Sequence, residues 1–445
     1  MQKQPMLIAG LGKTGFSIAR HLQRQNQPFI AFDTREAPEV LSAFREAFPG
    51  VETFTGTLPD SVFSSLCAVV ASPGVPLDTP VLQKAHALNI PVWGDIECLA
   101  REIDAPVIAI TGTNGKSTVT ALVGEMARMA GMRVAVAGNI GTPVLDVLET
   151  AEVPEIWVLE LSSFQLDLQE SLRPIAAAIL NVTPDHLDRH KSLEAYVAAK
   201  HRIAHHASTL VINREDPLTR PPAASGTTCI SFGLDAPSAD NWGLQTENGH
   251  TYLSRGPKQL LDCADLPLQG RHNWQNALAA AALAHSAGIS DEAIVRALTS
   301  FKGLPHRCQW VRTLDGVQWI NDSKGTNTGA TVSAIAGTGA SLSGKIVLIA
   351  GGQGKGADFS ELRAPVEAFG RAVVLIGEDA EKIARALDGT VPLHRAATLK
   401  DAIARARACA QPGDVVLLSP ACASFDMFRD FNHRGECFTR EVNAL

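Results

Sequence analysis

The stretch VIAITGTNGKSTVTALV, from Val107 to Val123, restricts the possible folds of this chain more than any other. An apolar run ends in a turn that contains Gly112 and Gly115, and a helical pattern follows directly. Backbone N–H groups of such a turn, together with the N-terminus of the next helix, form a concave anion site. We therefore expect a phosphate-binding loop in which Lys116 reaches the outer phosphates and the Ser117 hydroxyl binds Mg²⁺.

The spacing departs from the common pattern GxxxxGK[ST], because the position five before Gly115 is Ile110. The structural alternative is an ordinary glycine-rich turn that contains a lysine by chance. Strand, glycine turn, Gly-Lys-Ser-Thr and helix in succession favour phosphate binding over that alternative. The expected nucleotide contacts of the loop are Gly112, Thr113, Asn114, Gly115, Lys116, Ser117 and Thr118.

Short apolar runs alternate with amphipathic helical stretches along most of the chain, which is the pattern of an α/β fold with largely parallel sheets. Expected helices include 291–300 and 399–410, and short antiparallel strands are expected between Pro217 and Pro267. The expected strands are Met6–Ala9, Ala68–Ala71, Val107–Thr111, Trp157–Leu161, Ala177–Asn181, Leu210–Ile212, Ile346–Ala350, Val373–Ile376 and Val415–Leu418. At 445 residues the chain exceeds one hydrophobic core, and glycine turns in AGLGKTG, TGTNGKST and AGGQGKGADF suggest three nucleotide-fold-like units.

Composition excludes several classes of protein. A formal net charge of −7 argues against a general nucleic-acid binder. No run approaches the roughly 18 apolar residues of a membrane span, and the N-terminus does not resemble a secretory signal. The 8 cysteines are scattered without a CxxC pair, which favours reduced thiols and a cytoplasmic protein.

A second glycine turn, in LIAGLGKTG, allows two interpretations. Gly10, Gly12 and Gly15 follow a strand, and Asp33 comes about 20 residues later, as in a dinucleotide-binding fingerprint. Read alone, this predicts an NAD-dependent dehydrogenase. The turn requires only a phosphate-bearing ligand, however, and DTRE after the second strand suits another nucleotide equally well.

Two further motifs suggest groups that act beside the phosphate loop. Glu160 ends an apolar strand in VLELSSFQL, where a carboxylate could hold Mg²⁺. His186 follows a strand beside Asp185, a common position for α/β active sites. Lys200, in AYVAAKHRI, is in most such cases only the solvated end of a helix face. The surrounding histidines lack zinc-site spacing, and we interpret His190, His205 and His206 as surface residues.

The C-terminal half contributes three polar motifs. Asn273 and Asn276 lie three apart in GRHNWQNALAA, where they could bracket an adenine or simply cap a helix. Asp322 and Lys324 follow a strand in INDSKGTN. The segment SPACASFDMFRDF predicts a turn followed by a helix that carries Phe428 and Phe431, with Phe428 in the core.

Taken together, these motifs resemble the Mur ligases, the ATP-dependent amide ligases of peptidoglycan precursor synthesis. The resemblance rests on TGTNGKST, LELSSFQ, NVTPDHLDRH, HNWQNALAA, LPHRCQ, NDSKGTN and SPACASFDMF, in this order, and covers essentially the full chain. Within the family, GLGKTG, DTR, SPGV and GGQGKGADF look most like the member that adds D-glutamate to UDP-N-acetylmuramoyl-L-alanine.

The resemblance implies a fold of three domains. A Rossmann-like N-terminal domain (1–98) would bind the UDP substrate. A central P-loop ATPase domain (99–304) would have a mostly parallel sheet with a small antiparallel addition. A Rossmann-like C-terminal domain (305–445) would close on ATP and D-glutamate. The implied contacts of the UDP substrate are Leu11, Thr14, Asp33, Thr34, Ser72, Pro73, Gly74, Asn139 and His186. Lys13 stands where the family leads us to expect an apolar residue.

The resemblance also implies the chemistry of the other two sites. ATP would phosphorylate the L-alanine carboxylate, and the amine of D-glutamate would then attack the acyl phosphate. Lys116, Glu160, His186 and Lys200 would be catalytic, with one Mg²⁺ at Ser117 and Glu160 and a second near His186 and a carbamylated Lys200. Adenosine and phosphates would be held by Asn273, Asn276, Arg307, Asp322 and Lys324. The D-glutamate pocket would be lined by Lys324, Thr326, Lys355, Ser424 and Phe431.

Three other readings stay open at this point. One is another amide ligase of the same fold, such as the L-alanine- or diaminopimelate-adding member or a folylpolyglutamate synthetase. The others are an NAD-dependent oxidoreductase and a non-catalytic nucleotide sensor. For the leading interpretation we expect a cytoplasmic monomer with small-molecule substrates, no nucleic acid and no membrane insertion.

Overall fold

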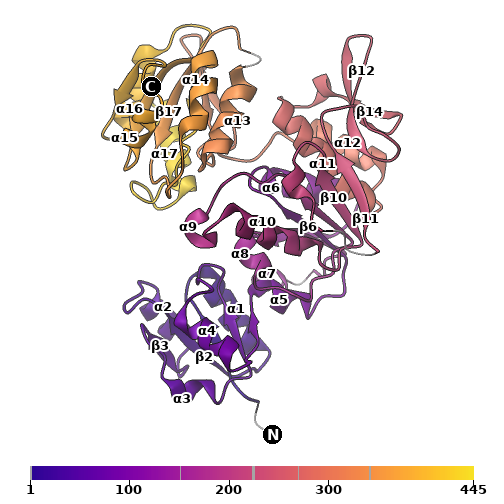
Figure 1. Cartoon of the computed structure of the whole chain (residues 1–445), viewed down its shortest axis with the longest axis vertical. Coiled ribbons are helices and arrows are strands. Elements are labelled where there is room, and N and C mark those ends of the chain that lie inside the picture. Colours follow the sequence, from indigo (N-terminus) through magenta and orange to yellow (C-terminus); the bar gives the residue numbers. More distant parts are fainter. Residues whose placement is uncertain (1–2, 151, 223–225, 269, 340–341) are drawn as a thin grey trace.

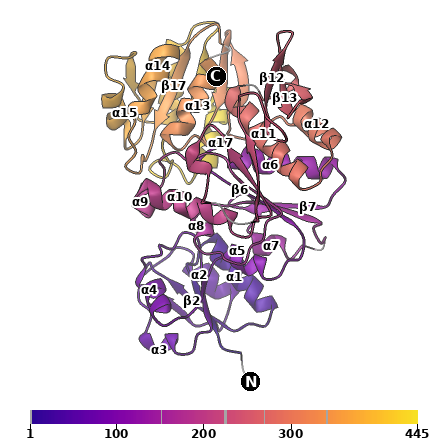
Figure 2. The same ribbon diagram turned by 45° about the vertical axis from the view of Figure 1, so that its right-hand side comes forward.

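A computed structural model describes residues 3–150, 152–222, 226–268, 270–339 and 342–445. The chain forms three lobes that follow one another along the sequence, as Figure 1 shows. In the turned view of Figure 2, the central lobe stands between the N-terminal and C-terminal ones. None of the helices in the described ranges is long and apolar enough to cross a membrane.

The N-terminal lobe is a five-stranded parallel sheet with strand order β3-β2-β1-β4-β5. Its strands are β1 (Met6–Ala9), β2 (Phe29–Asp33), β3 (Thr53–Thr55), β4 (Ala68–Ala71) and β5 (Val92–Trp93). Its helices are α1 (Lys13–Arg24), α2 (Leu41–Ala47), α3 (Asp60–Phe63) and α4 (Pro80–Ala87). Gly10, at φ +93°, turns the chain from β1 into α1, and a Cβ on Gly15 would collide with the Gly10 carbonyl. Only glycine allows α1 to begin this close to the strand.

The central lobe contains a nine-stranded sheet with strand order β14-β13-β12-β11-β10-β9-β6-β8-β7. Its strands are β6 (Val107–Thr111), β7 (Val134–Gly138), β8 (Ile156–Glu160), β9 (Ala176–Ile179), β10 (Thr209–Asn213), β11 (Thr228–Phe232), β12 (Trp242–Glu247), β13 (His250–Arg255) and β14 (Lys258–Asp262). Only the pairs β12–β13 and β13–β14 are antiparallel, which confirms the antiparallel addition expected between Pro217 and Pro267. β11, in the same region, pairs parallel with β10.

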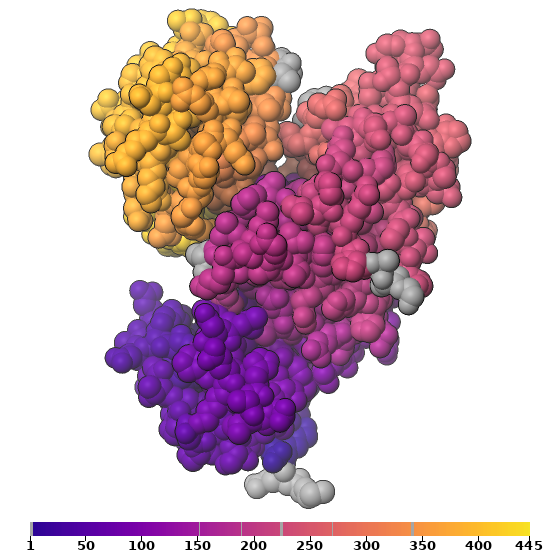
Figure 3. All heavy atoms as spheres, in the orientation of Figure 1, coloured from indigo at the N-terminus to yellow at the C-terminus, as the bar shows by residue number. Residues whose placement is uncertain are grey.

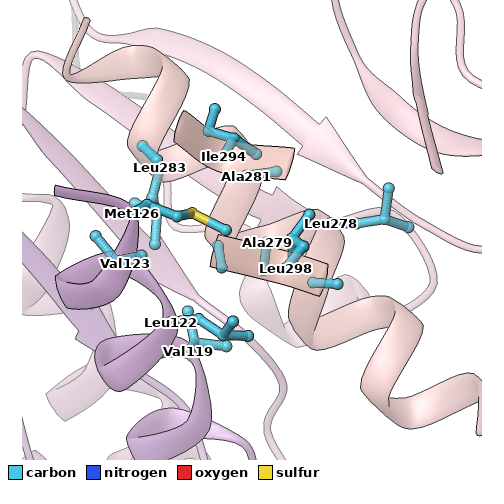
Figure 4. Packing of buried hydrophobic residues seen from close by; sticks show 14 of the residues in the cluster. Val119, Leu122, Val123, Met126, Leu278, Ala279, Ala281, Leu283, Ile294 and Leu298 are labelled. Atoms are coloured by element: carbon cyan, nitrogen blue, oxygen red, sulfur yellow. The ribbon is translucent and has the colours of Figure 1, made fainter. Parts of the chain in front are cut away.

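Helices of the central lobe cover both faces of this sheet. They are α5 (Asp95–Ala100), α6 (Lys116–Met129), α7 (Val144–Val147), α8 (Ser163–Leu166), α9 (Leu187–His190), α10 (Leu193–His201), α11 (Arg271–Ser286) and α12 (Asp291–Ser300), with 3₁₀ turns at Arg202–Ala204, Pro217–Thr219 and Cys263–Asp265. Val119 and Met126 of α6 pack against Leu283 and Leu298 of α11 and α12 (Figure 4), and all four are buried. Truncating one such side chain to alanine costs about 2–5 kcal/mol. This packing fixes α6, whose first residue is Lys116.

The C-terminal lobe has a six-stranded sheet with strand order β15-β16-β20-β17-β18-β19, in which only β15 is antiparallel. Its strands are β15 (Gln309–Leu314), β16 (Val317–Asn321), β17 (Ile346–Gly351), β18 (Gly370–Ile376), β19 (Leu393–Arg395) and β20 (Val415–Leu418). Its helices are α13 (Thr328–Gly339), α14 (Arg363–Phe369), α15 (Ala380–Ala386), α16 (Leu399–Cys409) and α17 (Phe431–Asn443), with a 3₁₀ turn at Ser360–Leu362.

One expected helix begins later than predicted. Phe428 was expected on the same helix as Phe431, but α17 begins at Phe431, because Asp430 is extended and its side chain accepts a hydrogen bond from the His433 amide. Such a cap marks a helix start. Phe428 lies before the helix and still packs against the core of the C-terminal lobe, as expected.

The lobes are joined in two different ways. A single apolar cluster contains Ile8 and Ile18 of the N-terminal lobe together with Trp157 and Leu159 of the central lobe. The two apolar clusters of the C-terminal lobe contain only residues from Cys308 onward among those described. A furrow separates the C-terminal lobe from the upper part of the central lobe in Figure 3. The N-terminal and central lobes therefore share a core, whereas the C-terminal lobe has its own.

Candidate active site

The loop between β6 and α6 has the geometry of an anion site. Gly112 and Gly115 have φ values of +152° and +82°, and α6 begins at Lys116. Lys116 Nζ donates to the carbonyls of Gly112 (2.9 Å) and Thr113 (2.8 Å). Burial lowers the pKa of Lys116, while the nearby Glu160 and Asp185 carboxylates oppose that shift. A half-buried cation at a helix N-terminus suits a polyphosphate.

Asn181 holds this loop and was missed by the sequence interpretation. Its side-chain oxygen accepts from the Asn114 amide (2.8 Å), and its Nδ2 donates to the Asn114 carbonyl (3.0 Å). Asn181 lies just beyond the end of β9, the neighbour of β6 in the sheet. Its position at a strand end, before the motif VTPDH, was the only sequence signal.

Glu160 ends β8 and faces the same region, as expected. Its Oε1 accepts from Asn139 Nδ2 (2.8 Å). Its Oε2 is buried without a hydrogen-bond partner among the described residues. Leaving a buried carboxylate oxygen unpaired is unfavourable, and carboxylate and hydroxyl oxygens are ligands that Mg²⁺ prefers. Glu160 and Ser117 thus fit a magnesium ion.

Lys200 is buried, so the alternative of a solvated helix end is wrong. Its Nζ donates to the Gly112 carbonyl (2.8 Å) and lies 4.3 Å from the centre of the Tyr196 ring. Burial and the charge of Lys116 lower the pKa of Lys200 well below its usual value. A lysine with a lowered pKa is neutral more often than an exposed one.

His186 lies on a constrained backbone. It has φ +54° and precedes α9, and its ring meets that of Phe164 edge-on at 5.1 Å. His186 Nε2 lies 3.7 Å from Asp185 Oδ2. No group of three or more His, Cys, Asp or Glu side chains that could hold a metal occurs among the described residues. The expected second Mg²⁺ near His186 and Lys200 therefore stays a prediction.

The expectation for His190 is wrong. This residue is half-buried: its Nε2 lies 2.9 Å from Ser163 Oγ, and its ring stacks on Phe164 at 5.4 Å. Phe164 lies on α8, so α8 and α9 face each other across this contact. His205 and His206 are exposed, as expected.

The first turns of α11 approach the phosphate loop. A Cβ on Gly115 would collide with Asn276 Oδ1, so the asparagine side chain lies directly against the loop. Asn273 lies on the same helix, one turn earlier. The structure thus brings Asn276 to the loop, while contact of either residue with adenine stays a prediction.

The C-terminal lobe reaches the loop through polar side chains. Arg307 Nη2 donates to Ser117 Oγ at 2.6 Å. Asn327 Nδ2 donates to Asn114 Oδ1 (3.3 Å) and to Asp185 Oδ2 (3.1 Å). Asn327 was not singled out from the sequence. The third lobe therefore contacts the loop through polar side chains. An apolar interface would attach the lobe more firmly.

Asp322 supports the segment that carries Arg307. Its Oδ1 accepts from the Cys308 amide (3.1 Å) and its Oδ2 from Ser419 Oγ (2.6 Å). Burial raises the pKa of Asp322 to about 6, with these hydrogen bonds and Arg307 acting in the opposite direction. Both oxygens are already used within the lobe, and the expected contact with nucleotide stays a prediction.

Four cationic side chains converge beside the loop. Lys324 Nζ lies 3.8 Å from the centre of the Phe431 ring. The pKa of Lys324 is lowered to about 8, mainly by burial and next by the charge of Arg307. Lys116 and Lys355 lower it further, and Glu160 raises it. Burial is the main cause of this shift, and repulsion between the cations adds to it; an anion bound among them would offset that repulsion.

The remaining residues expected around D-glutamate lie on loops of the same lobe. Lys355 follows β17 at φ +53°, and Ser424 follows β20 and is buried. The Thr326 amide donates to the Lys324 carbonyl (2.8 Å). Arg434, missed from the sequence, is buried and donates to Ser323 Oγ (3.0 Å) and to the Cys422 carbonyl (3.1 Å). Arg434 thereby holds the loops after β16 and β20 together.

A cavity of about 610 Å³ lies between the N-terminal and central lobes. Its lining includes these expected substrate contacts: Leu11, Thr14, Asp33, Thr34, Ser72, Pro73, Gly74 and Asn139. Lys13, Arg35, Asp95 and Gln165 also line the cavity and were not assigned from the sequence. The cavity leads from the first glycine turn toward Asn139, which bonds Glu160 of the phosphate-loop site.

Asp33 in this cavity is already paired. Its oxygens accept from the Leu11 amide (3.0 Å) and from Arg35 Nε and Nη2 (2.8 and 2.9 Å). Burial raises the pKa of Asp33, but these partners outweigh it and the net pKa is lowered. Lys13 turns away from the glycine turn, because its Nζ donates to the Gly141 carbonyl of the central lobe (3.0 Å).

Comparisons with known proteins agree along the whole chain. Three family models match: the Mur ligase MurD-like N-terminal domain (residues 4–94), the Mur ligase middle domain (110–284) and the Mur ligase glutamate ligase domain (306–422). A UDP-N-acetylmuramoylalanine–D-glutamate ligase from Legionella pneumophila strain Paris is 61% identical over 441 residues, 99% of each chain. The enzyme of the same name from Pseudomonas aeruginosa is 50% identical over 99% of this chain and 98% of its own.

Solved structures share the fold at lower identity. The MurF ligase from Thermotoga maritima in complex with ADP has a TM-score of 0.64 at 18% identity, covering 100% of this chain and 96% of its own. The UDP-N-acetylmuramate–alanine ligase MurC from Thermotoga maritima has a TM-score of 0.61 at 20% identity, covering 99% of both chains. Family models over all three lobes and whole-length identity of 61% lead to one conclusion: the chain belongs to the Mur ligase family.

Proposed function

We propose that this Mur ligase joins D-glutamate to UDP-N-acetylmuramoyl-L-alanine at the expense of ATP, in cytoplasmic peptidoglycan precursor synthesis. The 61% identity to a ligase of that name supports D-glutamate over the other amino acids used in the family. The structural observation that carries the proposal is the contact of Arg307 of the C-terminal lobe with Ser117 of the phosphate loop (2.6 Å), next to Lys116 and with Lys324 and Lys355 of the same C-terminal lobe nearby. Triphosphate, substrate carboxylate and D-glutamate are all anions, and only such a site would hold them together.

The chemistry follows from the low reactivity of a carboxylate toward an amine. A carboxylate oxygen of the L-alanine end attacks the γ-phosphorus of ATP, and ADP leaves. The neutral amine of D-glutamate then attacks the acyl carbon, an N–H proton is lost to solvent, and inorganic phosphate leaves as the C–O bond breaks. Lys116 and Arg307 offset the negative charge that develops on the phosphoryl oxygens. Lys324, Lys355 and Ser424 would orient the carboxylates of D-glutamate, with Thr326 and Phe431 at the wall of the pocket.

Ser117 and Glu160 would hold Mg²⁺, which would supply positive charge to the phosphates of ATP. The lowered pKa of Lys200 supports carbamylation, because only the neutral amine reacts with CO₂. The resulting carbamate would turn a cation into an anionic ligand for a second ion beside His186. Gly112, Thr113, Asn114, Gly115 and Thr118 would surround the phosphates, with Asn273, Asn276 and Asp322 on the adenosine side.

The N-terminal cavity would hold the UDP part of the substrate, and Asn139 and His186 its muramoyl-alanine end. The match of residues 4–94 to the MurD-like N-terminal domain supports a UDP ligand over NAD in this cavity. In this proposal the substrate domain spans 1–98, the ATP domain 99–304 and the closing domain 305–445. The enzyme would act as a cytoplasmic monomer without nucleic acid or membrane partners.

The test is the dependence of phosphate release on substrates. Release from ATP is expected only when UDP-N-acetylmuramoyl-L-alanine and D-glutamate are both present, with L-alanine, diaminopimelate and L-glutamate as matched amino-acid controls. A separate titration should detect UDP-N-acetylmuramoyl-L-alanine and no NAD binding. Equal rates with another amino acid would identify another member of the family, and release from ATP alone would overturn the proposal.

A further inference from the structure

Arg189 crosses from the central lobe to the N-terminal lobe. It lies on α9, three residues after His186, and its guanidinium donates to three consecutive carbonyls beyond β4. Nη2 donates to Val75 (2.6 Å) and Pro73 (3.3 Å), and Nη1 donates to Gly74 (3.2 Å). A single side chain thus holds the segment 73–75 of one lobe from another.

The segment it holds forms a wall of the 610 Å³ cavity. Pro73, Gly74 and Val75 all line that cavity. The preceding Ser72 donates from Oγ to the Gly10 carbonyl (2.9 Å), and a Cβ on Gly10 would collide with Val75. The wall is therefore packed against the first glycine turn. A ligand bound on that turn would also contact the segment 73–75, which Arg189 holds.

The other side of Arg189 rests on the ring that also contacts His186. The guanidinium carbon lies 4.7 Å from the centre of the Phe164 ring, and His186 meets the same ring edge-on at 5.1 Å. Stacking on an aromatic face while donating in plane to several carbonyls is a geometry that arginine provides and lysine does not. One ring and one guanidinium therefore connect the cavity wall to His186 and Asp185.

We propose that Arg189 is a positioning residue that couples occupation of the substrate cavity to the placement of His186 at the phosphate loop. The proposal rests on the proposed function, because the cavity ligand is taken to be UDP-N-acetylmuramoyl-L-alanine. Binding of that substrate fixes residues 72–75, Arg189 transmits this to α9, and α9 sets the position of His186. Asp185 in turn accepts from Asn327 of the C-terminal lobe (3.1 Å), so the same segment also faces the closing domain.

Amide hydrogen exchange tests this coupling without reference to turnover. In the wild type, UDP-N-acetylmuramoyl-L-alanine should slow exchange both in 72–75 and in 185–191. In Arg189→Ala and Arg189→Lys the protection of 72–75 should persist, while protection of 185–191 should fall by about fivefold or more. Arg202→Ala is the matched control, because Arg202 also donates to a backbone carbonyl, that of Leu166 (2.8 Å), but stays within the central lobe. That control should lose thermal stability and keep both protections.

Steady-state kinetics give a second readout. Both Arg189 variants should have a lower kcat and a KM for UDP-N-acetylmuramoyl-L-alanine that is raised about tenfold, which is the size expected for the loss of a charge-assisted hydrogen bond. The KM for ATP should be nearly unchanged. The coupling would be overturned if 185–191 were equally protected in the variants and the wild type. It would also be overturned if the wild type showed protection of 72–75 but none of 185–191. Neither result would contradict the proposed function. Absence of any protection at 72–75 in the wild type would instead contradict the proposed substrate.

Discussion

Arg307 of the C-terminal lobe donates to Ser117 of the phosphate loop at 2.6 Å, although 190 positions separate them in the chain. The hydroxyl that Arg307 holds is the one expected to bind Mg²⁺ with the nucleotide. If Ser117 binds Mg²⁺ as expected, Arg307 would release it when Mg²⁺-ATP binds, and the phosphates would be the new partner for its charge. Through this contact, nucleotide binding would be coupled to the position of the C-terminal lobe.

Arg307→Ala should lower kcat/KM for ATP by about 10- to 100-fold, since a hydrogen bond to a charged group contributes about 1.5–3 kcal/mol. Arg307→Lys should recover only part of this, because the planar fork is lost. Initial rates at varied ATP provide the measurement, with the exposed Arg405→Ala of α16 as control. Equal rates for all three variants would show that Arg307 does not reach the nucleotide.

Lys116→Ala should reduce turnover by at least about 100-fold, because the triphosphate loses the cation at the N-terminus of α6. The variant should still fold, since the Lys116 hydrogen bonds in the described part of the chain go to the Gly112 and Thr113 carbonyls of its own loop. Phosphate release and a thermal melt measure the two effects separately. Near-normal turnover in a folded variant would contradict the phosphate-loop assignment.

The pH dependence of D-glutamate binding should report Lys324. Its pKa is lowered to about 8, so the ammonium is present below that pH and is lost as the pH rises through it. The KM for D-glutamate should therefore increase above about pH 8 in the wild type. Lys324→Arg keeps its charge, and its KM should stay flat up to about pH 10. The same increase in both proteins would assign the effect to another group.

Lys200 should carry a carbamate under turnover conditions. Incubation with ¹³C-bicarbonate should give a carbamate ¹³C signal in the wild type that is absent in Lys200→Ala and in Lys200→Arg. Both variants should lose most activity, and a small carboxylate such as formate at high concentration should partly restore it in Lys200→Ala alone. A wild type without this signal, together with near-normal activity of Lys200→Ala, would refute the second metal arrangement.

The sequence predicted the main elements because their patterns are local. The bounds of β1, β4, β6, β20 and α12 are as predicted. β1 and β6 each lie between a proline and a glycine, and Ser290 caps α12. Glu160 at a strand end and the glycines of the phosphate loop follow from the same local rules. The start of α17 was misplaced, because Asp430 and not the preceding turn caps it.

Residues that join segments distant in the sequence could not be predicted in this way. Asn181, Arg189, Asn327 and Arg434 hold loops that are distant in sequence, and a single polar residue in a loop carries no periodic signal. Lys200 and His190 looked like surface residues because their burial depends on α8, α9 and the loop at Gly112. Only tertiary packing distinguishes them from solvated side chains.

The most direct measurement of the central claim follows one oxygen atom. UDP-N-acetylmuramoyl-L-alanine labelled with ¹⁸O in both oxygens of its carboxylate is incubated with enzyme, ATP and D-glutamate, and phosphate and product are analysed by mass spectrometry. An acyl phosphate predicts one ¹⁸O in each released phosphate and one retained in the new amide, with a product mass that includes one glutamate. Unlabelled phosphate, or a product without glutamate, would contradict it.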